Sequence, residues 1–401
     1  MNPTDFAEVH DELRSVARRL LAPASPLAGG AGAGGAAEAG GATAQARAEG
    51  QTNGIGAPGS GPSSSVRTRA VWGRMAGAGW LGLEVPEAFG GAGATFAEVA
   101  VIAEELGRAA TASPYLGTVA LGVGALRLVE PGPGRDGLLA TIAAGTSVVA
   151  VALATGADDG VAAPPPFRIE RSSGGLRLHG QATFVPDGTA ATLLCVAHDP
   201  TAGPVLVRVD AGQPGVVVGE QAVLDATRTF AVVTAAGIEV DAADVWRFTA
   251  DPLLLQIRGA VAVALDSLGV GEAMLAATVA YASVRAQFGR PIGSFQAVKH
   301  ACADMHVQLA VSRELVTAAV RQLADGDPEA EVTASMAKAH AAETAVAVAG
   351  SAMQLHGGIG YTAESGIHTY LKRAALNRSL FGSPRAHRAR LAQRFAGASP
   401  R

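Results

Sequence analysis

The periodicity of apolar residues changes twice along this chain, and these changes limit the folds that it can adopt. Between about Ser147 and Trp246, apolar and polar residues alternate in short runs separated by Gly, Pro and Asp, as in β-strands. Before and after this region, apolar residues recur every three or four positions, as on one face of an α-helix. The sequence therefore predicts a small antiparallel β domain between two helical parts. Its strands are expected at residues 148–153, 167–170, 176–178, 191–197, 205–209, 216–218 and 230–233.

The C-terminal part carries the longest helical patterns. Ser383 followed by Pro384 is typical of a helix start, with the serine as N-cap and the proline at the first helical position. The predicted domains are an N-terminal helical domain (1–145), a middle β domain (146–247) and a C-terminal helical bundle (248–401). Helices are expected at residues 5–21, 66–79, 95–108, 115–129, 251–287, 294–324, 328–356, 364–380 and 384–395.

Residues 22–65 differ in composition from the rest of the chain. They consist mainly of Ala, Gly, Ser and Pro, with almost no large apolar side chains. Such a segment cannot bury enough apolar surface to offset the entropy lost on ordering it. We therefore expect a disordered insertion between the first and second helices.

Composition excludes several classes of function. The 401 residues are 49% hydrophobic, and a net charge of −4 argues against a nucleic-acid partner. Cys195 and Cys302 lie far apart in the sequence, so neither a disulfide framework nor a zinc site is predicted, and no other metal site is expected. Asp266 and Glu272 interrupt the apolar run at residues 259–281, and the N-terminus shows no signal segment. We expect a cytoplasmic protein that does not bind membranes.

Two motifs carry most of the functional information. The first is Gln354-Leu355-His356-Gly357-Gly358-Ile359-Gly360-Tyr361, at the end of a long helical pattern. Glycines there let a backbone approach a ligand closely, because no Cβ intervenes. The motif alone is weak, since a helix cap has the same composition.

The second motif, Arg285-Ala286-Gln287-Phe288-Gly289, lies about seventy residues upstream, and Gln296 follows it. A guanidinium group suits a pyrophosphate, and an aromatic face suits a flat ring. Arg285 taken alone could equally form an ordinary ion pair.

In this order, the motifs RxQFGxPIGxFQ, QLHGGIGY and a Ser-Pro helix start resemble those of the acyl-CoA dehydrogenase family. Residues 79–86, 90–93 and 104–108 share the resemblance, which covers most of the chain outside residues 22–66. It implies an N-terminal α-helical domain, a middle antiparallel β domain and a C-terminal four-helix bundle. It also implies FAD at a subunit interface, where a carboxylate takes the α proton of an acyl-CoA thioester and the β hydride passes to the flavin.

In that family, these motifs of one subunit hold the adenosine and pyrophosphate end of the FAD whose flavin sits in the neighbouring subunit. The matching residues, which the resemblance assigns to FAD binding, are Arg285, Gln287, Phe288, Gln296, Gln354, Gly357 and Gly358.

The catalytic base departs from the family pattern. The usual glutamate stands 27 positions beyond the glutamine of the glycine motif, and Phe381 occupies that position here. A minority of the family places it about 26 positions before the arginine of RxQFG, where this chain has Gly259. Neither side chain can accept a proton. No catalytic residue is therefore predicted.

Two elements expected near the flavin are also altered. A T-E-P-x-x-G-S-D run is typical of the family, whereas residues 154–160 read ATGADDG. The usual Trp-Ile-Thr reads Phe184-Val185-Pro186, and Pro186 has neither a hydroxyl nor a backbone N–H to offer. This chain's own flavin pocket is thus expected to be degraded.

The resemblance implies an oxidoreductase of lipid or steroid side-chain degradation. It favours the base-lacking subunit of an actinobacterial α2β2 heterotetramer, whose homologous partner supplies the base for an acyl-CoA substrate. One alternative is a homotetrameric dehydrogenase with a relocated base, such as Asp266 or Glu364. Another is a non-dehydrogenating flavin protein, for which a basic C-terminal helix could indicate nucleic acid. Glu104 and Glu105 are expected on a helix surface.

Overall fold

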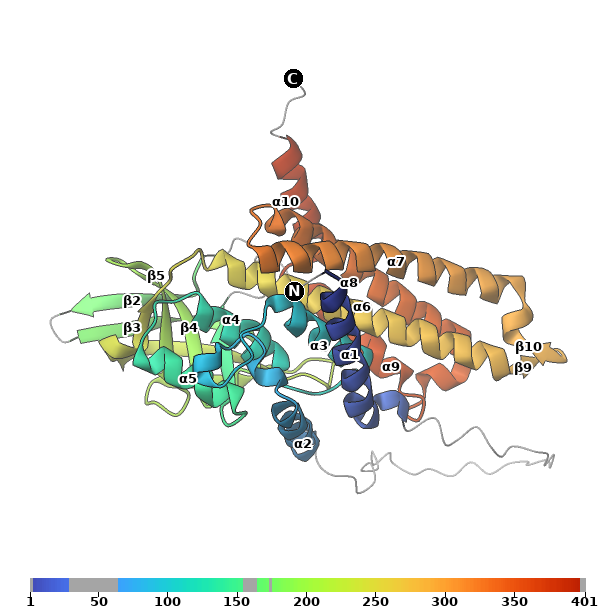
Figure 1. Cartoon of the computed structure of the whole chain (residues 1–401), viewed down its shortest axis with the longest axis horizontal. Helices are drawn as coiled ribbons and strands as arrows, with labels where there is room; N and C mark the ends of the chain where they lie inside the picture. The colour runs from blue at the N-terminus through green and yellow to red at the C-terminus, as the bar shows by residue number, and fades with distance from the viewer. Residues whose placement is uncertain (1–2, 29–63, 154–163, 173–174, 397–401) are drawn as a thin grey trace, which may run out of the picture.

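Three parts follow one another along the chain: N-terminal helices, a β-sheet and C-terminal helices (Figure 1). The computed structural model describes residues 3–28, 64–153, 164–172 and 175–396. The predicted fold class is confirmed. Of the expected insertion, residues 29–63 lie outside the described residues, while 22–24 form a short 3-10 helix and 64–65 belong to the second helix.

The helices agree closely with the expected ones, with one addition, α5. The N-terminal helices are α1 (Pro3–Leu21), α2 (Ser64–Gly77), α3 (Phe96–Arg108), the π-helical η5 (Leu116–Val123), α4 (Gly124–Arg127) and α5 (Pro133–Ala143). The C-terminal helices are α6 (Leu253–Val284), α7 (Gln296–Asp325), α8 (Ala330–His356), α9 (Ile367–Ser379) and α10 (Pro384–Ala396).

The sheet has eight strands, in the order β6-β7-β3-β2-β4-β5-β8, with β1 paired to β4. Most pairs are antiparallel as expected, but β1 and β2 both run parallel to β4. They lie one after the other along the same side of β4, because β1 pairs with its first half and β2 with its last residues. The strands are β1 (Val149–Ala152), β2 (Phe167–Ser172), β3 (Gly175–Pro186), β4 (Thr192–Asp199), β5 (Gly203–Asp210), β6 (Val216–Glu220), β7 (Phe230–Val240) and β8 (Val245–Arg247).

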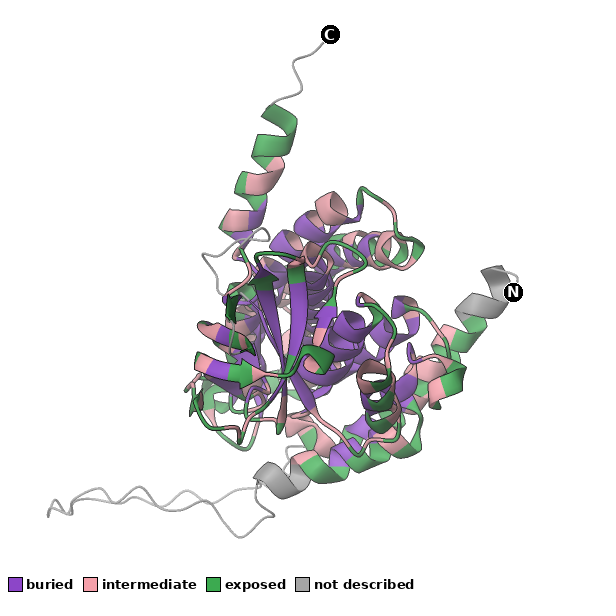
Figure 2. Cartoon of the chain, turned by 90° about the vertical axis from the view of Figure 1, so that its left-hand side faces the viewer, coloured by how far each residue is buried: buried purple, intermediate pink, exposed green. Residues whose placement is uncertain are grey.

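The N-terminal helices are fixed to the sheet at β1. All four residues of this strand are buried, and η5 packs against it. Thr118 of η5 donates its hydroxyl to the Val149 carbonyl (2.9 Å) and accepts the Val149 N–H (3.1 Å). The view from the sheet end shows the buried strands with exposed loops around them (Figure 2). This contact holds η5 beside the sheet.

The C-terminal helices α6, α7, α8 and α9 pack as a bundle around α6 and α8. The buried residues of α8 are mostly alanines, which allow close helix packing. Among the described helices, α6 is the one long and apolar enough to cross a membrane, and 83% of its most apolar window is buried inside the protein. The apolar side chains of α6 therefore form part of the core of the bundle.

Two expectations about charged residues need correction or refinement. Glu104 and Glu105 were expected on the surface but are buried, because Arg313 contacts the first and Arg18 the second. The arginines of α10 form ion pairs with glutamates of α8, namely Arg388 with Glu343, Arg390 with Glu331 and Arg394 with Glu329. Much of the basic character of α10 is thus neutralised within the chain.

A buried carboxylate on α6 joins all three parts. Asp266 receives hydrogen bonds from Arg373 (3.0 and 2.5 Å) and Asn377 (2.7 Å), and its carboxylate lies 2.8 Å from Arg228. Arg373 also donates to the Thr111 carbonyl, 3.0 Å away, in the segment that follows α3. Burial raises the pKa of Asp266, but the two arginines outweigh it and hold the pKa at about 2.

We predict that Asp266→Asn destabilises the protein by about 3–5 kcal/mol, because it leaves two buried guanidinium groups without their counter-charge. Denaturant unfolding of both proteins at pH 7 measures the difference. Asp11→Asn removes an exposed ion pair with Arg14 and should change stability by less than about 0.5 kcal/mol. Equal, small effects of the two substitutions would contradict the role assigned to Asp266.

Candidate functional site

The RxQFG motif forms a short hairpin at the end of α6. The strands are β9 (Ala286–Gln287) and β10 (Arg290–Pro291), joined by a two-residue turn. Both turn residues have positive φ, 52° at Phe288 and 77° at Gly289. Positive φ is unfavourable for an aromatic residue, yet the Phe288 ring is 92% exposed and gains no core packing. The strain therefore presents an aromatic ring to the outside.

The glycine motif lies at the same end of the bundle. His356 ends α8, with its Nδ1 2.7 Å from the Ala352 carbonyl oxygen, and its ring stacks on Tyr281 of α6 at 4.5 Å between centroids. A Cβ at Gly357 or Gly358 would meet no atom within 4 Å, so internal packing does not require these glycines. The glycine motif thus contacts α6 one turn before the RxQFG motif begins.

The polar side chains that the sequence predicts as FAD ligands make no hydrogen bonds within the described part of the chain, whereas Phe288 packs edge-on against Phe295 with 6.2 Å between ring centroids. Arg285, Gln287, Gln296 and Gln354 are exposed, and none makes a side-chain hydrogen bond to another described residue. Arg285 forms no ion pair in the described part of the chain, so the salt-bridge alternative gains no support. The predicted residues line one open end of the bundle.

The two possible positions of the catalytic base meet at one point. Phe381, between α9 and α10, is 4% exposed and has φ of 52°. A Cβ added to Gly259 of α6 would overlap the Phe381 ring, so this ring lies directly against the Gly259 backbone. An aromatic side chain therefore fills the space where either carboxylate would stand.

Two basic side chains hold the loop that carries Phe381. Lys338 of α8 donates to the Gly382 carbonyl oxygen at 3.0 Å, and His387 Nε2 lies 2.9 Å from the Phe381 carbonyl oxygen. Burial and, secondarily, Arg378 lower the pKa of Lys338 to about 7. Burial and then Lys338 lower the pKa of His387 to about 4, so its neutral ring donates through Nε2. The loop is fixed through its backbone.

The end of β3 completes an apolar cluster around Phe381. Phe184 packs edge-on against Phe230 with 6.4 Å between ring centroids, and all three phenylalanines belong to one core cluster. Pro186 is buried at the end of β3. Residues 154–160, the other altered element, lie outside the described residues. In the described part, Phe230, Phe381 and Pro186 are thus buried in apolar surroundings.

Sequence reasoning missed Asp187, the residue after Pro186. Its φ is 55°, and its carboxylate accepts hydrogen bonds from the Gly117 N–H (3.2 Å) and the Thr229 hydroxyl (3.3 Å). Burial raises the pKa of Asp187 to about 7, more than these hydrogen bonds and Arg228 lower it. The sequence offered one signal for it, because Asp187 directly follows the altered Trp-Ile-Thr element.

Comparison with known proteins identifies the family. Models of the acyl-CoA dehydrogenase N-terminal and C-terminal domains match residues 63–132 and 257–396. The chain is 32% identical over 315 residues to the acyl-CoA dehydrogenase IpdE2 of Mycolicibacterium smegmatis, covering 78% of this chain and 83% of that protein. The chain belongs to the acyl-CoA dehydrogenase family.

Other members extend the likeness along the chain. Acyl-CoA dehydrogenase FadE27 of Mycobacterium tuberculosis is 30% identical over 335 residues, 82% of this chain and 88% of that protein. The ChsE4–ChsE5 complex of Mycobacterium tuberculosis has a TM-score of 0.74 at 29% identity, covering 83% of this chain and 89% of the matched chain. A variant of the Tcur3481–Tcur3483 steroid ACAD has a TM-score of 0.78 at 28% identity and 98% coverage of both chains.

FAD is the cofactor of this family and of this chain. The open end of the bundle fits part of it, because the backbone at Gly357 and Gly358 is accessible and Arg285 has free donors for phosphate oxygens. The Phe184–Phe230–Phe381 cluster does not fit the rest, because hydrocarbon replaces the polar groups that a flavin ring and thioester require. The open end of the bundle thus offers polar groups to FAD, whereas the Phe184–Phe230–Phe381 cluster offers apolar ones.

The carboxylates weighed as relocated bases lie in unsuitable surroundings. Asp266 is saturated by arginine and asparagine donors, and its low pKa makes it a weak base. Glu364 is exposed in the segment between the glycine motif and α9, and Asp304 is exposed on α7. His356 is the last residue of α8, whereas His387 is buried against the loop that carries Phe381.

We predict that Gly259→Ala destabilises the protein by about 1–3 kcal/mol, because the added methyl group overlaps the Phe381 ring. In a Phe381→Ala background, the same change should cost less than about 0.5 kcal/mol. A double-mutant cycle of unfolding free energies measures this coupling. Gly350→Ala, in α8 with nothing within 4 Å of its added Cβ, should be neutral or stabilising. Additive effects at positions 259 and 381 would refute the contact.

Asp187 should make stability depend on pH. Its folded pKa of about 7 lies above the ordinary 3.8, so its stabilising contribution is complete below pH 3.8 and is lost as pH rises through 7. We predict that Asp187→Asn raises the melting temperature at pH 8.5, on the order of 2–4 °C, with a smaller difference at pH 5. Melting curves at both pH values test this, with exposed Asp304→Asn as control. A pH-independent difference would contradict the assignment.

Proposed function

We propose that this chain is the partner subunit of a heteromeric acyl-CoA dehydrogenase, which completes an FAD site without supplying the catalytic base. The observation that carries the proposal is the contact between Phe381 and Gly259, which fills both base positions at once. A site that had merely lost its function would lack the carboxylate and nothing more. In this chain the buried Phe381 ring packs in that space, and Lys338 and His387 hold the backbone of the loop that carries it.

The exposed end of the bundle supplies the other half of the argument. Arg285, Gln287, Phe288, Gln296, Gln354, Gly357 and Gly358 would hold the adenosine and pyrophosphate end of the partner's FAD. Their exposure and free hydrogen-bonding groups suit a ligand that comes with another subunit. When bound, FAD accepts a hydride in the partner's pocket; the residues of this chain bind and orient its far end.

Apolar surface around this end supports association with another chain. Val284 is 78% exposed and Tyr361 is 70% exposed, next to the even more exposed Phe288. Val279 and Ile359 are also among the exposed large apolar residues. Apolar surface of this kind is typical of subunit interfaces. We infer that a homologous subunit covers it, in an α2β2 assembly in the cytoplasm.

The relatives support the substrate class. Two of the similar solved structures are named after two different proteins each, ChsE4–ChsE5 and Tcur3481–Tcur3483, and the second is described as a steroid ACAD. We infer that the assembly performs α,β-dehydrogenation of an acyl-CoA thioester from lipid or steroid side-chain degradation. In such an assembly the partner's carboxylate would take the α proton. This chain would bind FAD and close the site against water.

The alternatives find less support in the geometry. A homotetramer with a relocated base needs an available buried carboxylate, whereas Asp266 is held by arginine and asparagine donors and Glu364 is exposed. A nucleic-acid-binding flavin protein needs a free basic surface, whereas Arg388, Arg390 and Arg394 are paired with glutamates. These pairs lower the net positive charge that α10 could offer to phosphates.

We predict that the chain purified alone binds little FAD, and that co-expression with a homologous acyl-CoA dehydrogenase that carries the catalytic glutamate gives about one FAD per pair of chains. Flavin absorbance and protein concentration measure the ratio. In the purified pair, Arg285→Ala should weaken FAD binding by about 1.5–3 kcal/mol, through loss of a charge-assisted contact. Arg74→Ala, on an exposed face of α2, is the matched control. One FAD per chain in the isolated protein would contradict the proposal.

Phe381→Glu should not give the isolated chain dehydrogenase activity. The carboxylate alone does not restore the polar flavin contacts that Phe184 and Pro186 have replaced. Turnover of an acyl-CoA with an artificial electron acceptor tests this, with far-UV circular dichroism to confirm folding. Activity of the isolated variant at the level of a complete homologue would overturn the partner role.

A further inference from the structure

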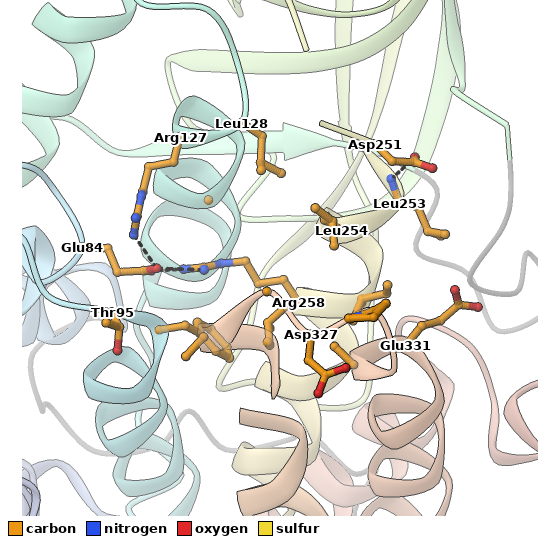
Figure 3. A pocket seen from close by; sticks show the side chains of 18 residues that line it. Glu84, Thr95, Arg127, Leu128, Asp251, Leu253, Leu254, Arg258, Asp327 and Glu331 are labelled. Atoms are coloured by element: carbon orange, nitrogen blue, oxygen red, sulfur yellow. Dashed lines mark hydrogen bonds and ion pairs between the residues drawn. The ribbon is translucent and has the colours of Figure 1, made fainter. Parts of the chain in front are cut away.

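A second cavity, of about 500 Å³, lies apart from both halves of the FAD site. It is enclosed by the start of α3, the end of α4, the first turns of α6 and the turn between α7 and α8 (Figure 3). Neither Phe381 nor any of the proposed FAD ligands lines it. Its volume is in the range of small-molecule sites. We name it the Arg127 cavity, after the side chain that lies free at one end.

The middle of the Arg127 cavity is apolar. Leu128, Leu253 and Leu254 line it and are only partly buried, although leucine is ordinarily among the most buried residues. Phe96 and Ile257 lie behind them and are buried. A hydrocarbon ligand would therefore remove apolar surface from water that the folded chain leaves uncovered.

One end of the cavity offers free hydrogen-bond donors. Buried Glu84 accepts from Arg127 Nη1 (2.9 Å) and from Arg258 (Nη1, 3.0 Å), while Arg258 also donates to Ala120 and covers the Phe96 ring at 4.3 Å. Arg258 is thus fully engaged. Nε and Nη2 of Arg127 have no hydrogen bond to a described residue, and 43% of this side chain is exposed. These N–H groups suit an oxygen acceptor.

The other end is acidic. Asp251, Asp327 and Glu331 lie across the cavity from Arg127 (Figure 3). Asp251 accepts from the Leu253 N–H and Asp327 from the Glu329 N–H, whereas Glu331 is paired with Arg390. The carboxylates of Asp251 and Asp327 disfavour an anionic ligand, including the phosphates of an acyl-CoA.

We propose that the Arg127 cavity binds an uncharged, mainly hydrocarbon molecule whose carbonyl oxygen accepts hydrogen bonds from Arg127. The leucines contact the hydrocarbon, the free N–H groups of Arg127 hold the oxygen, and the acids at the other end exclude carboxylates and phosphates. This site is separate from the dehydrogenation site, and the proposal does not depend on the partner-subunit role.

Two probes of equal carbon number test the proposal, 2-undecanone and undecanoate, titrated by calorimetry into the isolated chain and into the complex with its partner. 2-Undecanone should bind saturably, and undecanoate at least about tenfold more weakly. Arg127→Met should weaken ketone binding about tenfold, which corresponds to one lost hydrogen bond to a charged donor. Arg74→Met, at an exposed arginine on α2, should leave it unchanged.

Leu254→Asp should weaken ketone binding by at least about tenfold, because a charge replaces apolar wall. Val217→Asp, at an exposed valine on β6, is its control. Where Leu254→Asp fails to fold, Leu128→Gln tests the same wall. The proposal is overturned if 2-undecanone gives no saturable binding, if Arg127→Met and the folded wall variant bind it like the wild type, or if undecanoate binds more tightly than the ketone.

Discussion

The buried charge of Asp266 constrains the whole molecule. A carboxylate on the long, buried, apolar helix α6 must be neutralised, because an isolated ion in this interior would be costly. Its partners come from different parts, since Arg228 precedes β7 and Arg373 belongs to α9. The hydrogen bond from Arg373 to the Thr111 carbonyl adds the N-terminal helices. The ion pairs therefore fix how the sheet and the N-terminal helices sit on the bundle.

That orientation determines what can lie beside Gly259. With the sheet docked through Arg228, the end of β3 brings Phe184 into the apolar cluster that contains Phe381. The absence of a side chain at Gly259 lets the Phe381 ring approach the α6 backbone. The positive φ of Phe381 is unfavourable, and the hydrogen bonds to its carbonyl and to that of Gly382 offset part of this strain. The small Gly259 on α6 and the large Phe381 between α9 and α10 are thus complementary in shape.

Local patterns predicted most of the secondary structure, because the residues that start and end helices act over short distances. Ser383 caps α10 as its position before a proline suggested, while Thr95, expected as the first residue of a helix, is the N-cap of α3. The parallel pairing of β1 and β2 with β4 was not predictable from periodicity, which says which residues form strands but not which strands pair. Glu104 and Glu105 were misplaced because their arginine partners are distant in sequence. The Phe381–Gly259 contact needed the fold, although each substitution was visible in the sequence.

The contrast between the two ends of α6 is the strongest functional argument. Near its start, the helix is buried and its glycine accommodates an aromatic ring; at its end, Phe288 is held in a strained conformation with its ring almost fully exposed. At Phe381, the strained backbone conformation buries the ring, and packing within this chain offsets the strain. At Phe288, the strained conformation leaves the ring exposed, so it is best explained by a contact outside this chain. A degenerating enzyme would be expected to lose such a feature first. Its presence beside accessible glycines and an arginine that makes no ion pair with a described residue therefore agrees with the partner-subunit role proposed above.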